Sequence, residues 1–273
     1  MTLSQSNRNT GVREMAIDIP DDPLPLARLG KALEQTFGFG ISYEDAPWVY
    51  SADIDVAPEY PNRRKEALGG GRVARGGSLS IKFSVTEDGQ DPTVLPARIL
   101  QDALDLHRRK GNPGEFRLLP LDKDGFSIVA LRSRDAEGRL VSSRPPLDNR
   151  ISFPDAKMTG DDALDLILKS ASIASHNRIE RVNHPFYPNY SARIGANNEV
   201  ARDVLLRLVH ELAPSDPLDT SGRMRRIAWQ LTYDPNSGNY WFDWRLVIRA
   251  TVSPGGKGVL YAPVEIPRSR APR

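Results

Sequence analysis

Two pairs of neighbouring acidic residues are the side chains whose type and spacing come closest to catalytic chemistry. They are Glu44-Asp45 and Asp161-Asp162. Paired carboxylates act as general acid and base when a cleft holds them a defined distance apart and raises the pKa of one of them. Here the first pair ends a short apolar run and the second begins a helical pattern. The sequence therefore predicts a turn and a helix cap.

The four histidines show no metal-binding pattern. None of them belongs to an H-E-x-x-H motif or to an i, i+4 pair. His107 and His210 fall near the ends of predicted helices, where we expect the imidazole to face solvent or the helix dipole. The other two are His176 and His184.

A glycine-rich segment at 69–77, GGGRVARGG, has the composition of a phosphate-binding loop. A P-loop also needs Lys followed by Ser or Thr at the start of a helix, whereas this segment runs into a strand pattern. We therefore expect a flexible loop that becomes ordered on contact. The chain has no cysteine, which excludes thiol catalysis and Cys-ligated zinc, and it has no G-x-S-x-G motif. The sequence predicts no catalytic residue, no metal site and no cofactor.

Aromatic residues give the clearest signal for a binding surface. Three of the four tryptophans, Trp229, Trp241 and Trp244, fall in one predicted hairpin. Strand alternation directs every second residue from Tyr240 to Trp244 into the core, and it directs Trp241 and Arg245 to the other face. An exposed aromatic beside an arginine is typical of an interface. The alternative is that Trp241 covers a second layer of a small domain.

Further partner contacts are expected in an insertion and in the C-terminal tail. The insertion, 45–78, contains Trp48 and Tyr50, and a loop of this length inside a compact unit is usually functional or disordered. The two aromatics argue against pure disorder. In the tail the candidates are Tyr261, Arg268 and Arg270.

The elements that must position these residues follow one order twice: strand, helix, strand, strand, helix, strand, strand. In the first half they are 15–19, 26–37, 39–43, 79–85, 95–107, 116–121 and 126–132. In the second half they are 150–153, 159–174, 178–183, 190–195, 197–213, 227–233 and 240–248. The helices have apolar stripes of period 3.6 and the strands alternate. We expect an α+β fold of two tandem β-α-β-β-α-β-β modules, each with small sheets packed on two helices.

This reading divides the chain of 273 residues into five parts. They are a disordered N-terminus at 1–13, a first module at 14–136, a linker at 137–149, a second module at 150–250 and a Pro/Gly-rich basic tail at 251–273. The tail carries four basic residues and one acidic residue, so its net charge exceeds the formal charge of +2 of the whole chain. We expect no regular element in the tail and no broad nucleic-acid-binding surface on the body.

The unit resembles the short N-terminal domain of secretins and TonB-dependent receptors. The matching pieces are an I-x-I-P strand at Ile17–Pro20, an A-L helix step at Ala32-Leu33, and the hairpin W-Q-L-x-Y-D-P from Trp229 with Tyr240 and Phe242. The segment Tyr43–Pro47 is similar to a Y-E-D-x-P segment of exported bacterial proteins. The resemblance implies an envelope location and protein–protein docking without catalysis. The chain as given shows no leader peptide, secretin pore region or outer-membrane barrel, and the absent leader keeps a cytoplasmic location open.

The sequence thus favours a non-catalytic, periplasmic-side interaction or structural protein, an accessory subunit that docks on a membrane-associated complex. Its tail would reach onto a partner or an anionic surface, and no stretch is apolar enough to span a bilayer. One alternative is a periplasmic protein that binds a small molecule or glycan between its modules. The other is an enzyme of unidentified type.

Overall fold

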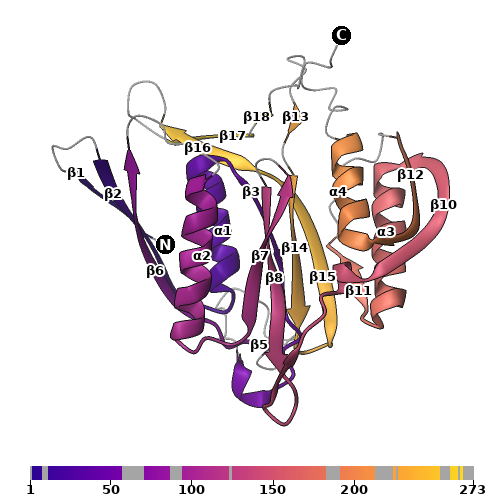
Figure 1. Cartoon of the computed structure of the whole chain (residues 1–273), viewed down its shortest axis with the longest axis horizontal. Helices are drawn as coiled ribbons and strands as arrows, with labels where there is room; N and C mark the ends of the chain where they lie inside the picture. The colour runs from indigo at the N-terminus through magenta and orange to yellow at the C-terminus, as the bar shows by residue number, and fades with distance from the viewer. Residues whose placement is uncertain are drawn as a thin grey trace.

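The protein is a mixed α+β protein (Figure 1). The computed structural model describes residues 2–7, 12–56, 71–86, 94–122, 125–182, 191–212, 224–225, 227–252, 259–263 and 265–266. None of the helices in these ranges has the length and hydropathy needed to cross a bilayer.

The main elements follow the predicted order. In the first half they are β2 (Val12–Asp22), α1 (Pro25–Phe37), β3 (Gly40–Glu44), β6 (Gly77–Thr86), α2 (Val94–Arg109), β7 (Glu115–Asp122) and β8 (Gly125–Arg134). In the second half they are β10 (Arg150–Thr159), α3 (Gly160–Ser175), β11 (Ile179–Arg181), β12 (Ser191–Val200), α4 (Ala201–Leu212), β14 (Ile227–Asp234) and β15 (Asn239–Leu246).

Shorter elements complete the described chain. They are β1 (Thr2–Asn7), η1 (Ser51–Asp53), β4 (Ile54–Val56), β5 (Arg72–Ala74), β9 (Leu140–Ser142), η2 (Pro146–Asp148), β13 (Met224–Arg225), β16 (Ile248–Val252), β17 (Val259–Pro263) and β18 (Glu265–Ile266).

One seven-stranded sheet runs through both halves. Its order is β11-β15-β14-β3-β8-β7, and β9 also pairs with β8. β14 lies parallel to β3, so the β14–β15 hairpin of the second half joins the β3–β8 pair of the first half in one sheet. We expected separate small sheets in each module. The structure differs because β3 has a free edge, and a strand from the other half satisfies its backbone hydrogen bonds.

The pairing pattern is the same in the two halves. β3 lies parallel to β8 with Ile41 opposite Phe126, and β11 lies parallel to β15 with Ile179 opposite Tyr240. β7–β8 and β14–β15 are antiparallel hairpins, and β2–β6 and β10–β12 are antiparallel pairs.

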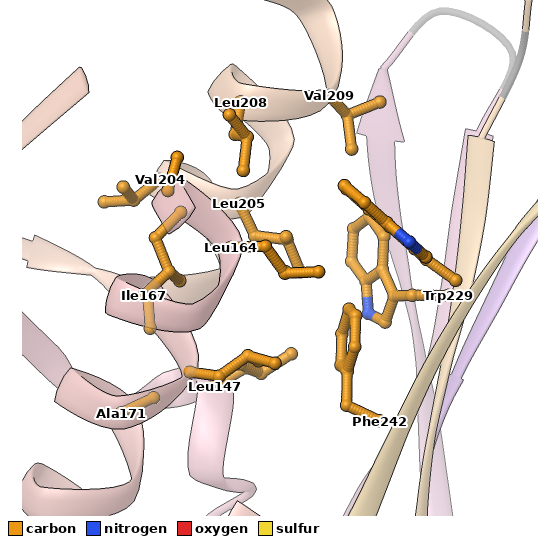
Figure 2. Close-up of a cluster of buried hydrophobic side chains, with 14 of the residues drawn as sticks. Leu147, Leu164, Ile167, Ala171, Val204, Leu205, Leu208, Val209, Trp229 and Phe242 are labelled. Carbon is orange, nitrogen blue, oxygen red and sulfur yellow. The ribbon is translucent and has the colours of Figure 1, made fainter. Parts of the chain in front are cut away.

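Each pair of helices is sandwiched between two sheets. α1 and α2 pack between β2–β6 and the β3–β8 part of the large sheet, and α3 and α4 pack between β10–β12 and β14–β15. The two helix pairs cover opposite faces of the large sheet (Figure 1). Figure 2 shows the second core, where Trp229 and Phe242 of the sheet meet Leu164 of α3 and Leu205 of α4.

Helices α1 and α3 start and stop where their sequences predict, whereas α4 begins at Ala201 and not at the predicted residue 197, because β12 continues to Val200 in its pairing with β10. α1 begins at Pro25 and ends at Gly38, which has a φ of 80°. α3 begins after Thr159, whose side chain accepts a hydrogen bond from the backbone N–H of Asp162, so the helix-cap prediction for Asp161-Asp162 is confirmed. The apolar stripe of each helix is buried, as predicted.

The two chain ends differ from our expectation. β1 pairs antiparallel with β2 inside the segment expected to be disordered. A polar segment can form this strand because the outer edge of β2 presents unpaired backbone groups. In the tail, β17 pairs antiparallel with β16, and Pro263 is only its last residue. The prolines therefore delimit a short strand without preventing it.

The linker and the insertion also contain regular structure. Within 137–149, β9 pairs with β8, and Leu147 of η2 is buried in the second core. Within 45–78, η1 is followed by the antiparallel pair β4–β5. β5 lies in the glycine-rich segment that we expected to be a flexible loop, and residues 69–70 of that segment lie outside the described ranges.

Candidate functional site

The most elaborate polar site lies where β3 meets β14. We call it the junction cluster: Tyr43, Glu44, Asp45, Asp148, Arg202 and Trp229. β3 and the residue after it supply the first three, and η2, α4 and β14 supply the others. The cluster is thus assembled from both halves of the chain.

Glu44 and Arg202 form a buried bidentate ion pair. Arg202 Nε donates to Glu44 Oε1 at 2.6 Å and Nη2 donates to Oε2 at 2.5 Å, and the two side chains are 0% and 6% exposed. Arg202 Nη1 also pairs with Asp148, and Trp229 Nε1 donates to Glu44 Oε1 at 3.3 Å. Burial disfavours the charged guanidinium, but the carboxylates of Glu44 and Asp148 outweigh it and raise the pKa of Arg202.

Asp45 is surrounded by hydrogen-bond donors. Its carboxylate accepts from Tyr43 Oη at 2.8 Å, Trp48 Nε1 at 3.0 Å, and the backbone N–H groups of Ala46 at 3.1 Å and Tyr233 at 3.2 Å. Burial raises the pKa of Asp45 to about 7, although these hydrogen bonds oppose the shift. Burial of the Tyr43 side chain, together with the charge of the neighbouring Asp45, raises the pKa of Tyr43 well above its ordinary value.

A second ion pair crosses between the halves on the other face of the sheet. Arg245 of β15 donates from Nη2 to Glu34 Oε1 of α1 at 2.9 Å and to the carbonyl of Ile41 at 3.2 Å. Glu34 also accepts from the backbone N–H of Ile41 at 3.0 Å. Burial raises the pKa of Glu34, although Arg245 opposes the shift.

These groups hold the two halves together, and their oxygens are already occupied by internal donors. A general acid or base needs an acceptor or proton that a substrate can reach, whereas Glu44 and Asp45 are fully buried. The prediction of a turn at Glu44-Asp45 is wrong, because Glu44 is the last residue of β3 and both side chains are held by partners in the interior. The residues around Glu44 and Asp45 give no sign that the two carboxylates are buried and paired, because their partners Arg202 and Tyr233 are distant in sequence.

A different kind of site lies on the sheet face opposite α3 and α4. Trp241 is paired with Glu180 of β11 on one side and with Thr232 of β14 on the other, so the three side chains share a face. Asp243 and Val182 continue it two residues along their strands. We call Glu180, Val182, Thr232, Trp241 and Asp243 the open face. Trp241 is 37% exposed and Val182 is 36% exposed.

The predicted contact residues therefore fall into an exposed group and a buried or half-buried group. Trp241 lies on the face that strand alternation predicts, and its exposure favours the first of its two predicted positions, the exposed one, over a place beneath a second layer. Trp48 is buried beside Asp45 and is corrected to an internal anchor, and Arg245 is corrected to an internal ion-pair partner because Glu34 binds it. Tyr50 is half-buried, with the guanidinium of Arg134 5.7 Å from its ring centroid.

Of the three contacts predicted in the tail, the structure describes the backbone of Tyr261. The backbone of Tyr261 lies in β17, paired with Ala250. Arg268 and Arg270 lie outside the described residues.

His107 differs from its expected exposed position. It is buried at the end of the α2 stripe, edge-on to Phe116 with 5.5 Å between ring centroids. Burial lowers the pKa of His107 to about 4. Across the described ranges, no three His, Asp or Glu side chains gather in a group that could hold a metal ion.

An open hollow of about 770 Å³ is lined by residues of β10, β12 and α4, all in the second half of the chain. Its charged lining residues are matched internally: Arg193 pairs with Asp155, and Arg207 pairs with Glu199. The hollow is therefore not the pocket between modules that the ligand-binding alternative predicts.

Comparisons of the chain with models of known families, with curated proteins and with solved structures find no significant match.

Proposed function

We propose that this protein is a non-catalytic docking protein built from two copies of a module similar to the short N-terminal domain of secretins and TonB-dependent receptors. The repeated order of strand pairings supports the two-copy part. The envelope location and the membrane-associated partner come from the sequence resemblance alone.

The observation that carries the docking function is the exposed Trp241 on the open face. A tryptophan at the centre of a largely polar surface is typical of a binding hot spot, because it buries much apolar area with little loss of side-chain entropy. The buried ion pairs Glu44–Arg202 and Glu34–Arg245 support the same function in another way. They tie both halves into one frame, so the open face is presented without reorganisation.

Site-specific photo-crosslinking tests this proposal. A photoreactive amino acid would replace Trp241 in the full chain, and Lys169, exposed on α3, would be the control position. We expect one discrete protein adduct from position 241 and none from position 169. If position 241 gives no adduct, or both positions give the same diffuse products, the docking function is wrong.

Glycan binding is the second candidate, because Trp241 lies beside the carboxylates Glu180 and Asp243. An indole can stack on a sugar ring while nearby carboxylates bind its hydroxyls. A panel of oligosaccharides at saturating concentration would then raise the Tm, and Trp241→Ala would abolish the shift. An unchanged Tm across the panel would leave protein docking as the function.

A further inference from the structure

The large sheet has two outer strands, β7 at one end and β11 at the other. No other described strand pairs with the outer edge of either. An unpaired edge presents backbone N–H and C=O groups that can accept another strand. The question is which strand would fit.

Such a pairing already exists inside the chain, between β3 of the first half and β14 of the second half, and we call it the join. β14 lies parallel to β3 with Leu231 opposite Glu44, and the N–H of Asp45 donates to the carbonyl of Leu231 at 2.8 Å. The edge of β3 therefore accepts the outer edge of a hairpin strand from the other half.

β7 and β11 are counterparts of the two strands in that join. Leu118 of β7 lies opposite Ile128, as Leu231 of β14 lies opposite Phe242. β11 also pairs with β15 as β3 pairs with β8. Ile179 lies opposite Tyr240, the second residue of β15, and Ile41 lies opposite Phe126, the second residue of β8. The outer edges of β7 and β11 thus have the same relation as the edges that already pair inside the chain.

Exposure supports the same correspondence. Trp241 lies opposite Glu180, and its counterpart Ser127 lies opposite Ser42. Ser127 is fully buried and Trp241 is 37% exposed. Val182 is the counterpart of Glu44, which the join also buries completely. The open face is therefore exposed at the positions that the join covers in the first half.

The side chains at these edges are matched at the position of the buried ion pair. One position along, the same register places Arg117 opposite Arg181, and each arginine keeps a carboxylate of its own half, Asp148 for Arg117 and Asp161 for Arg181. The stripe of α2 from Ile99 corresponds to the stripe of α4 from Val204, so Ala97 corresponds to Arg202, two residues before the stripe. Inside the chain Glu44 meets Arg202. At the free edges the corresponding residues are Val182 and Ala97, so two apolar side chains replace the ion pair and no buried charge is left without a partner.

Pro120 on β7 does not prevent the pairing. Its counterpart is Tyr233, whose N–H donates to the side chain of Asp45. The missing N–H of proline therefore removes a bond to a side chain but no backbone-to-backbone hydrogen bond between the strands.

Resting on the proposed docking function, we propose that the partner of the open face is a second copy of this chain. The β7 edge of one copy pairs in parallel with the β11 edge of the next, and α2 covers Val182 and Trp241. The contact is heterologous, so every assembly keeps one free β7 edge at one end and one free β11 edge at the other, and it extends as a filament with a continuous sheet.

Sedimentation velocity of the full chain, from low micromolar to near-millimolar concentration, tests this proposal. We expect the wild type to form a concentration-dependent series of oligomers. Val182→Glu and Ala97→Arg should each weaken assembly by at least about tenfold in concentration, because each buries an unpaired charge. Combining the two variants, in one chain or by mixing, should restore assembly because it recreates the Glu44–Arg202 pair.

Val141→Glu is the matched control, because Val141 is 40% exposed on β9 and lies at neither outer edge. It should assemble like the wild type. A wild type that stays monomeric overturns the proposal, as does a Val182→Glu variant that assembles like Val141→Glu. A crosslink from position 241 to a different protein, with no self-association, would support docking and reject the second copy as partner.

Discussion

Removing Arg202 would leave the Glu44 carboxylate charged and unpaired in the interior. We predict that Arg202→Met lowers the free energy of unfolding by about 3–5 kcal/mol, because a buried charge without its partner is strongly destabilising. Chemical denaturation of the full chain measures this loss. The second substitution Glu44→Gln should recover much of it, since the amide keeps an acceptor for Trp229 without the charge.

Arg207→Met is the control for Arg202→Met. Arg207 pairs with Glu199, but both side chains are substantially exposed, so the change should cost less than about 1 kcal/mol. Equal losses from the two variants would show that the buried position of Arg202 does not matter.

Asp45 should make stability depend on pH. Its pKa is about 7 in the folded chain and about 3.9 in an unfolded chain, so the raised folded value favours folding fully only below about pH 4. This contribution is lost as pH rises to 7. We predict that the stability of the wild type relative to Asp45→Asn falls between pH 4 and 7, as measured by denaturation across that range.

His107 supplies the opposite slope as a control. Its pKa of about 4 lies below the unfolded value of about 6.5, so its contribution is complete above pH 6.5 and is lost as pH falls toward 4. The stability of the wild type relative to His107→Leu should therefore rise with pH. If both differences have the same sign of slope, our assignment of charge in these buried sites is wrong.

At the scale of elements, the β10–β12 pair depends on a glycine. A Cβ at Gly195 would lie 2.6 Å from the Cα of Asp155, so the two backbones approach too closely for any side chain. The pair also contains register shifts between Ile151 and Ala156. We predict that Gly195→Ala destabilises the protein by about 1–3 kcal/mol, because the strands must separate. Thermal unfolding measures the effect.

Gly71→Ala is the matched change, since a Cβ there would have no atom within 4 Å. It should leave the Tm almost unchanged. A Gly195→Ala variant as stable as Gly71→Ala would mean that the strands move apart without cost.

The elements themselves could be predicted well from local patterns. The stripe from Leu26 to Phe37 and the stop at Gly38 predict α1, because a helix depends on contacts between residues a few positions apart. The short strand β17 was missed because its pairing partner, and not its own composition, makes it a strand.

At the scale of the whole molecule, the two halves should unfold together. The large sheet, the Glu44–Arg202 pair and the Glu34–Arg245 pair all cross between them. We predict a single cooperative transition, in which circular dichroism and tryptophan fluorescence coincide. Two separate transitions, or a stably folded fragment of residues 14–136, would contradict this expectation.

The sequence by itself determined the α+β class, the order of the main elements, the buried faces of the helices and the strand face on which Trp241 lies. Each of these depends on periodicity or on residues close in sequence. Only the tertiary structure decided that β3 and β14 share a sheet and that Glu44, Asp45 and Trp48 are buried. Their partners come from residues far along the chain, and a charged side chain shows by its type neither that it is paired nor that it is buried.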